Sequence, residues 1–195
     1  MLYLNQTEYS HMKYPHAADQ MDPSWEKKTV ASSGCGICSM CMIVEHLTCD
    51  SLSLEECVRL AVESGASHNN PGTEMLKLAP VVCEKFGLEF VATNSVSELL
   101  QHLHRGGEAM IRTGGDREGY VGLFSRGRHY VTVISANENE ICVLDPSFKE
   151  GKYDKEGRKE NVRVDFPYLY CNADLLEQEI IGQQFGFYLF KRKGQ

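Results

Sequence analysis

The spacing of apolar residues changes near the middle of the chain, from a helical period to a strand-like one. After Ser33 or Gly34, apolar residues recur every three or four positions, which predicts an amphipathic helix. These positions are Ile37, Met40, Cys41, Val44 and Leu47. Residues 1–33 have no sustained period, and we expect them to form an ordered arm.

Three more helices are predicted before the strand-like part begins. Ser53 with Glu56, and Ser95 with Glu98, have the spacing of capping boxes, which mark the first residues of helices. Between them, a helix is expected to start after residue 73 and to end at residue 87. Pro80 is expected to kink this helix or to shorten it, because proline has no backbone N–H to donate.

After residue 107, short runs of β-branched and aromatic residues bounded by turn residues predict strands. The runs are 108–113, 130–136, 141–145, 162–166 and 185–190. A short helix over 172–181 interrupts the last two. Helices first and strands afterwards are typical of an α+β fold, with N-terminal helices packed on an antiparallel sheet. We therefore expect a single domain over residues 1–195, with an arm (1–33), a mainly helical part (34–107) and a mainly antiparallel part (108–195).

Composition and charge exclude several functional classes. The chain has 20 Lys and Arg against 27 Asp and Glu, a formal net charge of −7, whereas nucleic-acid binding depends on basic residues that neutralise phosphates. No apolar run reaches the roughly 18 residues of a membrane span, and the first residues do not resemble a secretory signal. We therefore expect a cytoplasmic protein, with no nucleic acid as partner and no membrane span, whose eight cysteines are mostly free thiols. The sequence has no readable signature of oligomeric state.

The segment SSGCGICSMCMIV, residues 32–44, places Cys35 between two glycines where the first predicted helix begins. The amides of a first helical turn and the helix dipole favour a thiolate there, and flanking glycines allow a substrate backbone to approach closely. Cys35 is therefore a candidate nucleophile. The alternative is that Gly34 and Gly36 form a tight turn around a small buried cysteine.

A thiol nucleophile needs a base, and the base needs a group that orients it. His129 begins one predicted strand and Asp145 ends the next, with the polar turn NENE between the strands. In such a hairpin, the two side chains share a face only where the numbers of directly opposed residues have an even sum. Asp145 could then hold the imidazole of His129 and leave its other nitrogen for Cys35. Taken separately, His129 could cap a strand and Asp145 could form an Asp-Pro turn.

Three segments, GCGICSMCMIV, RHYVTVI and VLDPS, occur in this order, and together they resemble the papain-like cysteine peptidase superfamily. More narrowly, they are similar to the bacterial branch related to the peptidase domain that removes double-glycine leaders from bacteriocins. The likeness extends from Asn5 to about Phe148. It implies a papain-like fold and a triad of Cys35, His129 and Asp145.

The resemblance also implies a glutamine, upstream of the cysteine, whose side chain helps to form the oxyanion hole. In papain-like enzymes it usually precedes the cysteine by about one and a half helical turns, where this chain has Thr29. The candidates are Gln6 and Gln20, and Gln6 is favoured because related sequences with long N-terminal arms resemble its NQxxY pattern. The amide of Cys35 is expected to be another donor to the oxyanion. The alternative for both glutamines is a solvated loop residue.

The spacing of Cys35, Cys38 and Cys41 offers a competing interpretation, because it matches the start of an iron–sulfur motif. That motif needs a fourth cysteine at short spacing followed by proline, whereas the next cysteine here is Cys49. Cys38 and Cys41 are better explained as small residues that face the core. Motifs of zinc peptidases and of nucleotide-binding proteins do not occur, so neither a metal nor a cofactor is expected.

The sequence therefore predicts a thiol hydrolase that cleaves a peptide or amide bond through a Cys-His-Asp triad. An acyltransferase that uses the same thioester is a close alternative, because only the group that attacks the thioester differs. A catalytically silent papain-like fold that binds peptides is another. Two long loops stand out: a glycine-rich loop over 114–127, expected to gate or shape a cleft with Tyr120, Leu123 and Phe124, and a charged surface loop over 149–159.

Overall fold

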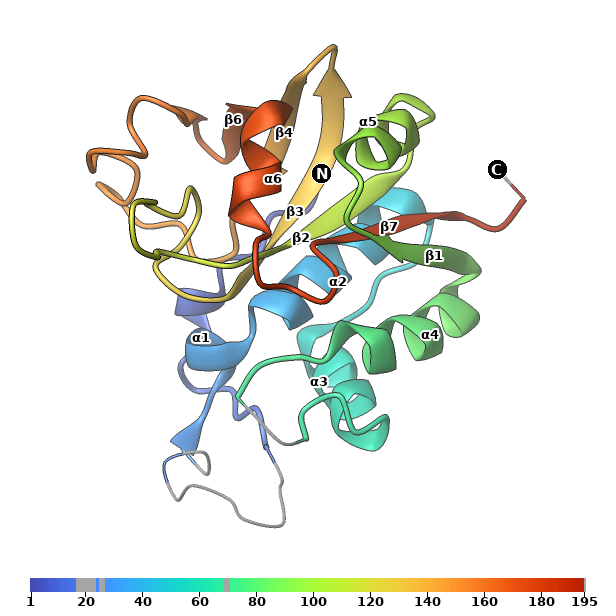
Figure 1. Ribbon diagram of the computed structural model, residues 1–195. Coiled ribbons are helices and arrows are strands. Elements are labelled where there is room, and N and C mark those ends of the chain that lie inside the picture. Colours follow the sequence, from blue (N-terminus) through green and yellow to red (C-terminus); the bar gives the residue numbers. More distant parts are fainter. Residues whose placement is uncertain (17–23, 25–26, 69–70, 195) are drawn as a thin grey trace. The chain divides into compact units, whose positions relative to one another are not determined.

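The computed structural model describes residues 1–16, 24, 27–68 and 71–194 (Figure 1). The chain forms two compact units, Met1–Phe90 together with Arg192–Gln195, and Val91–Lys191. The division falls inside a strand and not at the change of pattern near residue 107. That residues 1–195 form one domain stays a prediction.

The first unit is built around a central helix, α2 (Cys35–Leu47). A short 3-10 helix, η1 (Gln6–Glu8), and the one-turn helix α1 (Val30–Ser33) precede it and pack on each other. Two longer helices, α3 (Leu54–Glu63) and α4 (Met75–Phe86), follow and pack against α2 and against each other (Figure 1). The four helices expected before residue 108 are all present, α5 of the second unit being the fourth.

The surroundings of α2 differ from the sequence-based expectation. The apolar period predicts an amphipathic helix, whereas every residue from 36 to 44 is buried. A helix that is buried on all sides lies in the interior of a protein and does not cover its surface. Cys38 and Cys41 are fully buried, which confirms them as residues that face the core. Pro80 lies inside α4, and Gly87 ends that helix in the left-handed conformation, with φ at 65°.

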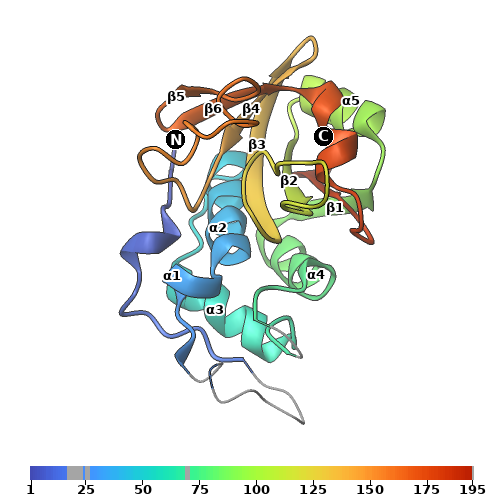
Figure 2. The same cartoon turned by 60° about the vertical axis from the view of Figure 1, so that its left-hand side comes forward.

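The second unit contains most of a seven-stranded sheet with the strand order β1-β7-β2-β3-β4-β6-β5. The strands are β1 (Leu88–Thr93), β2 (Glu108–Thr113), β3 (His129–Asn137), β4 (Glu140–Leu144), β5 (Arg163–Asp165), β6 (Tyr168–Asn172) and β7 (Phe187–Arg192). The pairs from β7 to β2 and on to β5 are antiparallel. Helix α5 (Val96–His104) packs on β2 and β3 (Figure 2), and η3 (Ala173–Leu175) and α6 (Leu176–Glu179) follow β6.

The predicted α+β class with an antiparallel sheet is confirmed, and the five predicted strands correspond to β2, β3, β4, β5 and β7 with differences only at their ends. The sequence did not indicate β1 and β6. Most residues of β1 are exposed or only partly buried, so its apolar alternation is weak. The pattern of β6 merges with the short helical segment that follows it.

The core of the second unit joins α5, the sheet and the glycine-rich loop. Leu99 and Leu103 of α5 pack in the same cluster as Val131 and Val133 of β3. Leu123 and Phe124 of the loop belong to this cluster too, and they are 2% and 0% exposed. The expectation of an apolar surface over a cleft is therefore wrong for Phe124, which the core covers. Leu123 is buried as well, but it also lines a pocket.

Candidate active site

His129 is the first residue of β3, Asp145 directly follows β4, and their side chains are hydrogen-bonded within the second unit. Nε2 of His129 lies 2.7 Å from Oδ1 of Asp145, and both residues are buried. A carboxylate only accepts hydrogen bonds, so the proton in this bond is carried by Nε2. In the neutral ring, the lone pair that can accept a proton is therefore on Nδ1.

The register between β3 and β4 explains why these two side chains share a face. Next to the turn, opposed residue numbers have an odd sum, as in Asn137 with Glu140, which would place the two side chains on opposite faces. A β-bulge after Val133 inserts one residue into β3 and makes the sum even, as in Val133 with Val143. The even-sum condition derived from the sequence is met at this end of the hairpin.

Asp145 accepts hydrogen bonds on both of its carboxylate oxygens. Besides the His129 ring, Oδ1 accepts from the backbone N–H and the hydroxyl of Ser147, at 2.8 and 3.1 Å. Oδ2 accepts from Nζ of Lys152 and, at 2.6 Å, from the hydroxyl of Tyr153. The carboxylate is therefore fixed from both sides.

The pKa of Asp145 is lower than the ordinary value for an aspartate, although the residue is buried. Burial by itself raises the pKa, but the hydrogen bond and charge of His129, followed by the charge and hydrogen bond of Lys152, outweigh this effect. Asp145 is thus ionised near neutral pH, as a group that orients a histidine must be.

Cys35 is the first residue of α2 and is partly exposed. The preceding Gly34 caps the helix, and its N–H donates to the carbonyl of Val30 at 2.7 Å. A Cβ atom at position 34 would lie only 2.6 Å from that carbonyl oxygen, so the close junction of α1 and α2 requires glycine there. This junction holds Cys35 at a helix N-terminus, where the dipole stabilises a thiolate.

Gln6 lies in η1, in the same unit as Cys35. It is 7% exposed, so the alternative of a solvated loop residue is wrong for it. Its Nε2 donates to the carbonyl of Ala31 in α1 at 2.9 Å, and its buried Oε1 has no hydrogen-bond partner among the described residues. Gln20, the other candidate, lies outside the described residues.

Most of the other thiols are buried in a way that opposes ionisation. Burial raises the pKa of Cys38, and a hydrogen bond with Cys57 together with burial raises that of Cys41. Burial also raises the pKa of Cys142, and it raises the pKa values of Cys83 and Cys171 to about 12. Cys49, by contrast, is exposed just beyond the end of α2.

Three further residues, which the sequence did not indicate, contact Asp145: Ser147, Lys152 and Tyr153. Ser147 had a local signal, since an Asp followed two residues later by a small polar residue is common in Asx turns. Lys152 and Tyr153 had none, because they lie in the loop predicted as a charged surface. That prediction is wrong for Tyr153 and Arg158, which are each 3% exposed.

The glycine-rich loop is fixed by two buried charged residues. Oε2 of Glu179, in α6, accepts from the hydroxyl of Tyr120 at 2.8 Å and from the N–H of Leu123 at 2.9 Å. Nε of Arg158 donates to the carbonyl of Gly122 at 2.7 Å. The loop over 149–159 is thereby tied to the glycine-rich loop.

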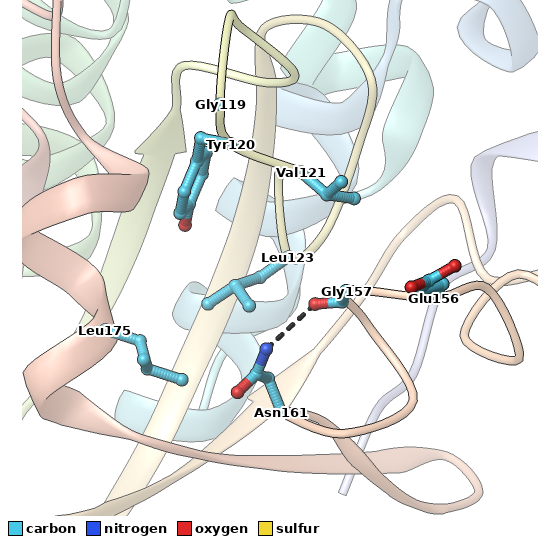
Figure 3. A pocket seen from close by; sticks show the side chains of 8 residues that line it. All are labelled: Gly119, Tyr120, Val121, Leu123, Glu156, Gly157, Asn161 and Leu175. Carbon is cyan, nitrogen blue, oxygen red and sulfur yellow. Dashed lines mark hydrogen bonds between the residues drawn. The ribbon is translucent and has the colours of Figure 1, made fainter.

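A pocket of about 540 Å³ lies in the second unit where these two loops meet (Figure 3). Its lining residues are Gly119, Tyr120, Val121, Leu123, Glu156, Gly157, Asn161 and Leu175. Nδ2 of Asn161 donates to the carbonyl of Gly157 at 2.9 Å (Figure 3). The volume is typical of small-molecule pockets. The loop over 149–159 therefore carries both part of the pocket lining and two of the residues that hold Asp145, Lys152 and Tyr153.

Within residues 1–16, 24, 27–68 and 71–194, no group of three or more His, Cys, Asp or Glu side chains could hold a metal ion. In the same part of the chain, no helix is both long enough and apolar enough to cross a membrane.

No protein-family model and no curated protein matches this chain. Among solved structures, it is similar to the peptidase domain of Streptococcus ComA, a bi-functional ABC transporter involved in a quorum sensing pathway. That match has a TM-score of 0.53 and 14% identity, and it covers 92% of this chain and 99% of the other. A putative C39-like peptidase from Bacillus anthracis matches with a TM-score of 0.56 and 13% identity, over 83% of this chain and 90% of the other. At this level of identity the likeness shows the fold, and the chain has the papain-like fold of these bacterial peptidase domains.

Proposed function

We propose that the chain is a papain-like thiol hydrolase that cleaves a peptide or amide bond, with Cys35 as nucleophile and His129 as base. The observation that carries the proposal is the buried hydrogen bond between Nε2 of His129 and Asp145. A ring held in this way has Nδ1 available in the correct tautomer to take the proton of a thiol. The fold and the position of Cys35 at a helix N-terminus support the same assignment.

In the proposed reaction, the Cys35 thiolate attacks the carbonyl carbon, and the oxyanion accepts hydrogen bonds from the Cys35 amide and from Gln6. His129 then gives the proton on Nδ1 to the leaving amine as the C–N bond breaks, and a thioester remains. Water loses a proton to His129 and attacks the thioester, which releases the acid and restores the thiol. Asp145 stays ionised throughout and orients the ring.

The experiment compares two thiols at opposite ends of the same helix. Iodoacetamide is added at pH 6 to 7, and the modification of Cys35 and of the exposed Cys49 is followed by peptide mass spectrometry. We expect Cys35 to react at least about tenfold faster than Cys49, because only Cys35 has a helix N-terminus and a histidine to favour its thiolate. Cys49→Ser serves as the control, since it should leave the rate at Cys35 unchanged.

In His129→Gln, the rate at Cys35 should fall toward that of Cys49, while circular dichroism confirms that the variant is folded. Equal rates at Cys35 and Cys49 in the unmodified sequence would contradict the proposal and would favour a silent fold that binds peptides.

A further inference from the structure

Lys152 contacts the candidate site from the side opposite to His129. Its side chain is 13% exposed, and Nζ donates to Oδ2 of Asp145. Nζ also donates to the hydroxyl of Ser147 at 2.7 Å and to the Ser147 carbonyl at 3.3 Å. An ammonium group has three N–H donors, and these three acceptors match them in number. Lys152 is therefore held in one position.

The contacts of Lys152 lead to Nε2 of His129 by two routes. Through Asp145, Lys152 and Tyr153 hold Oδ2, so that Oδ1 stays directed at the ring. Through Ser147, the hydroxyl that accepts from Lys152 lies 3.1 Å from Nε2. Removal of Lys152 would take away one hydrogen bond from the carboxylate and one from the hydroxyl, the two groups that border the proton on Nε2.

The positive charge of Lys152 also affects the protonation of the His129 ring. Three parts of the chain surround the Asp145 carboxylate. His129 of β3 contacts one oxygen, as does Ser147, and Lys152 and Tyr153 of the loop over 149–159 contact the other. A carboxylate alone stabilises the protonated imidazole strongly, because the two opposite charges are close and shielded from water. An ammonium group on the other oxygen offsets part of that negative charge, so the protonated ring gains less from it.

We propose that Lys152 is a positioning residue of this site: it fixes the Asp145 carboxylate against His129 and lowers the affinity of the His129 ring for its proton. The proposal rests on the proposed function, since it assigns Lys152 to the same site. A ring that gives up its proton more readily is a better acid toward the leaving amine, the step in which His129 must donate.

The test follows the protonation of His129 directly and needs no substrate. Histidine labelled with ¹³C is titrated by NMR in Cys35→Ser protein, so that no thiol titrates together with the ring. The His129 signal is assigned by its loss in His129→Gln. In Lys152→Met, the titration midpoint of His129 should rise by about one pH unit.

Matched variants separate charge from structure. Lys152→Arg keeps the positive charge and should restore the titration midpoint of His129. Lys152→Gln removes the charge and should behave like Lys152→Met. It takes the place of Lys152→Met if the methionine variant does not fold. Lys155→Met removes an exposed lysine from the same loop and should change nothing. An unchanged or lowered midpoint in folded Lys152→Met, or an arginine variant shifted as far as the methionine variant, would overturn the proposal. The proposed function fails on a different result, the absence of selective alkylation at Cys35.

Discussion

Asp145 is the residue on which the candidate site depends most. It is 1% exposed, and its carboxylate accepts from His129, Ser147, Lys152 and Tyr153. Removing the carboxylate would leave buried donors without an acceptor and would leave the charge of Lys152 without its partner. Such a change costs more than the net contribution of the lost hydrogen bonds.

Asp145→Ala is expected to lower the free energy of unfolding by about 2–4 kcal/mol at pH 7, and Asp145→Asn by less. The pKa of Asp145 is lowered in the folded state, so its stabilising contribution is complete above the ordinary aspartate pKa of about 3.9. The contribution is lost as the pH falls below that value toward the folded-state pKa. Urea unfolding between pH 7 and pH 3 measures the difference, and a difference that grows toward low pH would contradict this account.

Individual residues differ in how far the sequence could predict them. The place of Cys35 at the start of a helix and the pairing of His129 with Asp145 could be predicted, because each residue lies at the end of an element whose period is readable. The contacts of Lys152 and Tyr153 with Asp145 could not be predicted, because the path of their loop depends on tertiary contacts and not on the local sequence pattern. Their charged neighbours in the sequence indicated an exposed segment, although Tyr153 is buried.

Among the elements, the two long loops support each other across the pocket. Gly157 has a positive φ of 83°, and a Cβ there would lie 2.8 Å from the Cβ of Val121 in the glycine-rich loop. Gly151 has a similar φ of 72°, but the atom nearest to a Cβ there would be Oδ2 of Asp154, at 3.6 Å. A substitution at either glycine therefore causes the same kind of backbone strain. Only at Gly157 does the added side chain also lack space.

Gly151→Ala should cost about 1 kcal/mol, which is the penalty for a side chain at positive φ. Gly157→Ala should cost roughly 1–2 kcal/mol more, because the added methyl group also pushes the two loops apart. Urea unfolding of both variants gives the comparison. Equal losses would mean that the contact between Gly157 and Val121 contributes nothing.

The elements also show where local pattern stops being informative. The period of α2 was readable, but the same period suits an amphipathic and a fully buried helix when small residues such as Ser39 and Cys38 fill the other face. The bulge in β3 had no signal in the sequence, yet it converts the register from odd to even sums. From the sequence, the pairing of His129 with Asp145 could therefore be predicted only on the condition that the strand register places both side chains on one face.

For the whole molecule, the proposed mechanism divides between the two units. The nucleophile Cys35 and Gln6 belong to Met1–Phe90, and His129 and Asp145 belong to Val91–Lys191. The fold class could be predicted because helices and strands are separated along the chain, and the papain-like fold because three short segments occur in a specific order. That Cys35 and His129 act as a catalytic pair stays a proposal, because no local period of the sequence predicts a contact between them.

The most direct test of the proposed pair of Cys35 and His129 is cross-linking with 1,3-dibromoacetone. The Cys35 thiolate displaces one bromide, and the tethered second carbon then alkylates a nucleophile within three-carbon reach. Peptide mapping should find Cys35 joined to the ring of His129, and the product should be absent in Cys35→Ser and in His129→Gln. Modification of Cys35 without a link to His129, or a link to another residue in its place, would contradict the proposed catalytic pair.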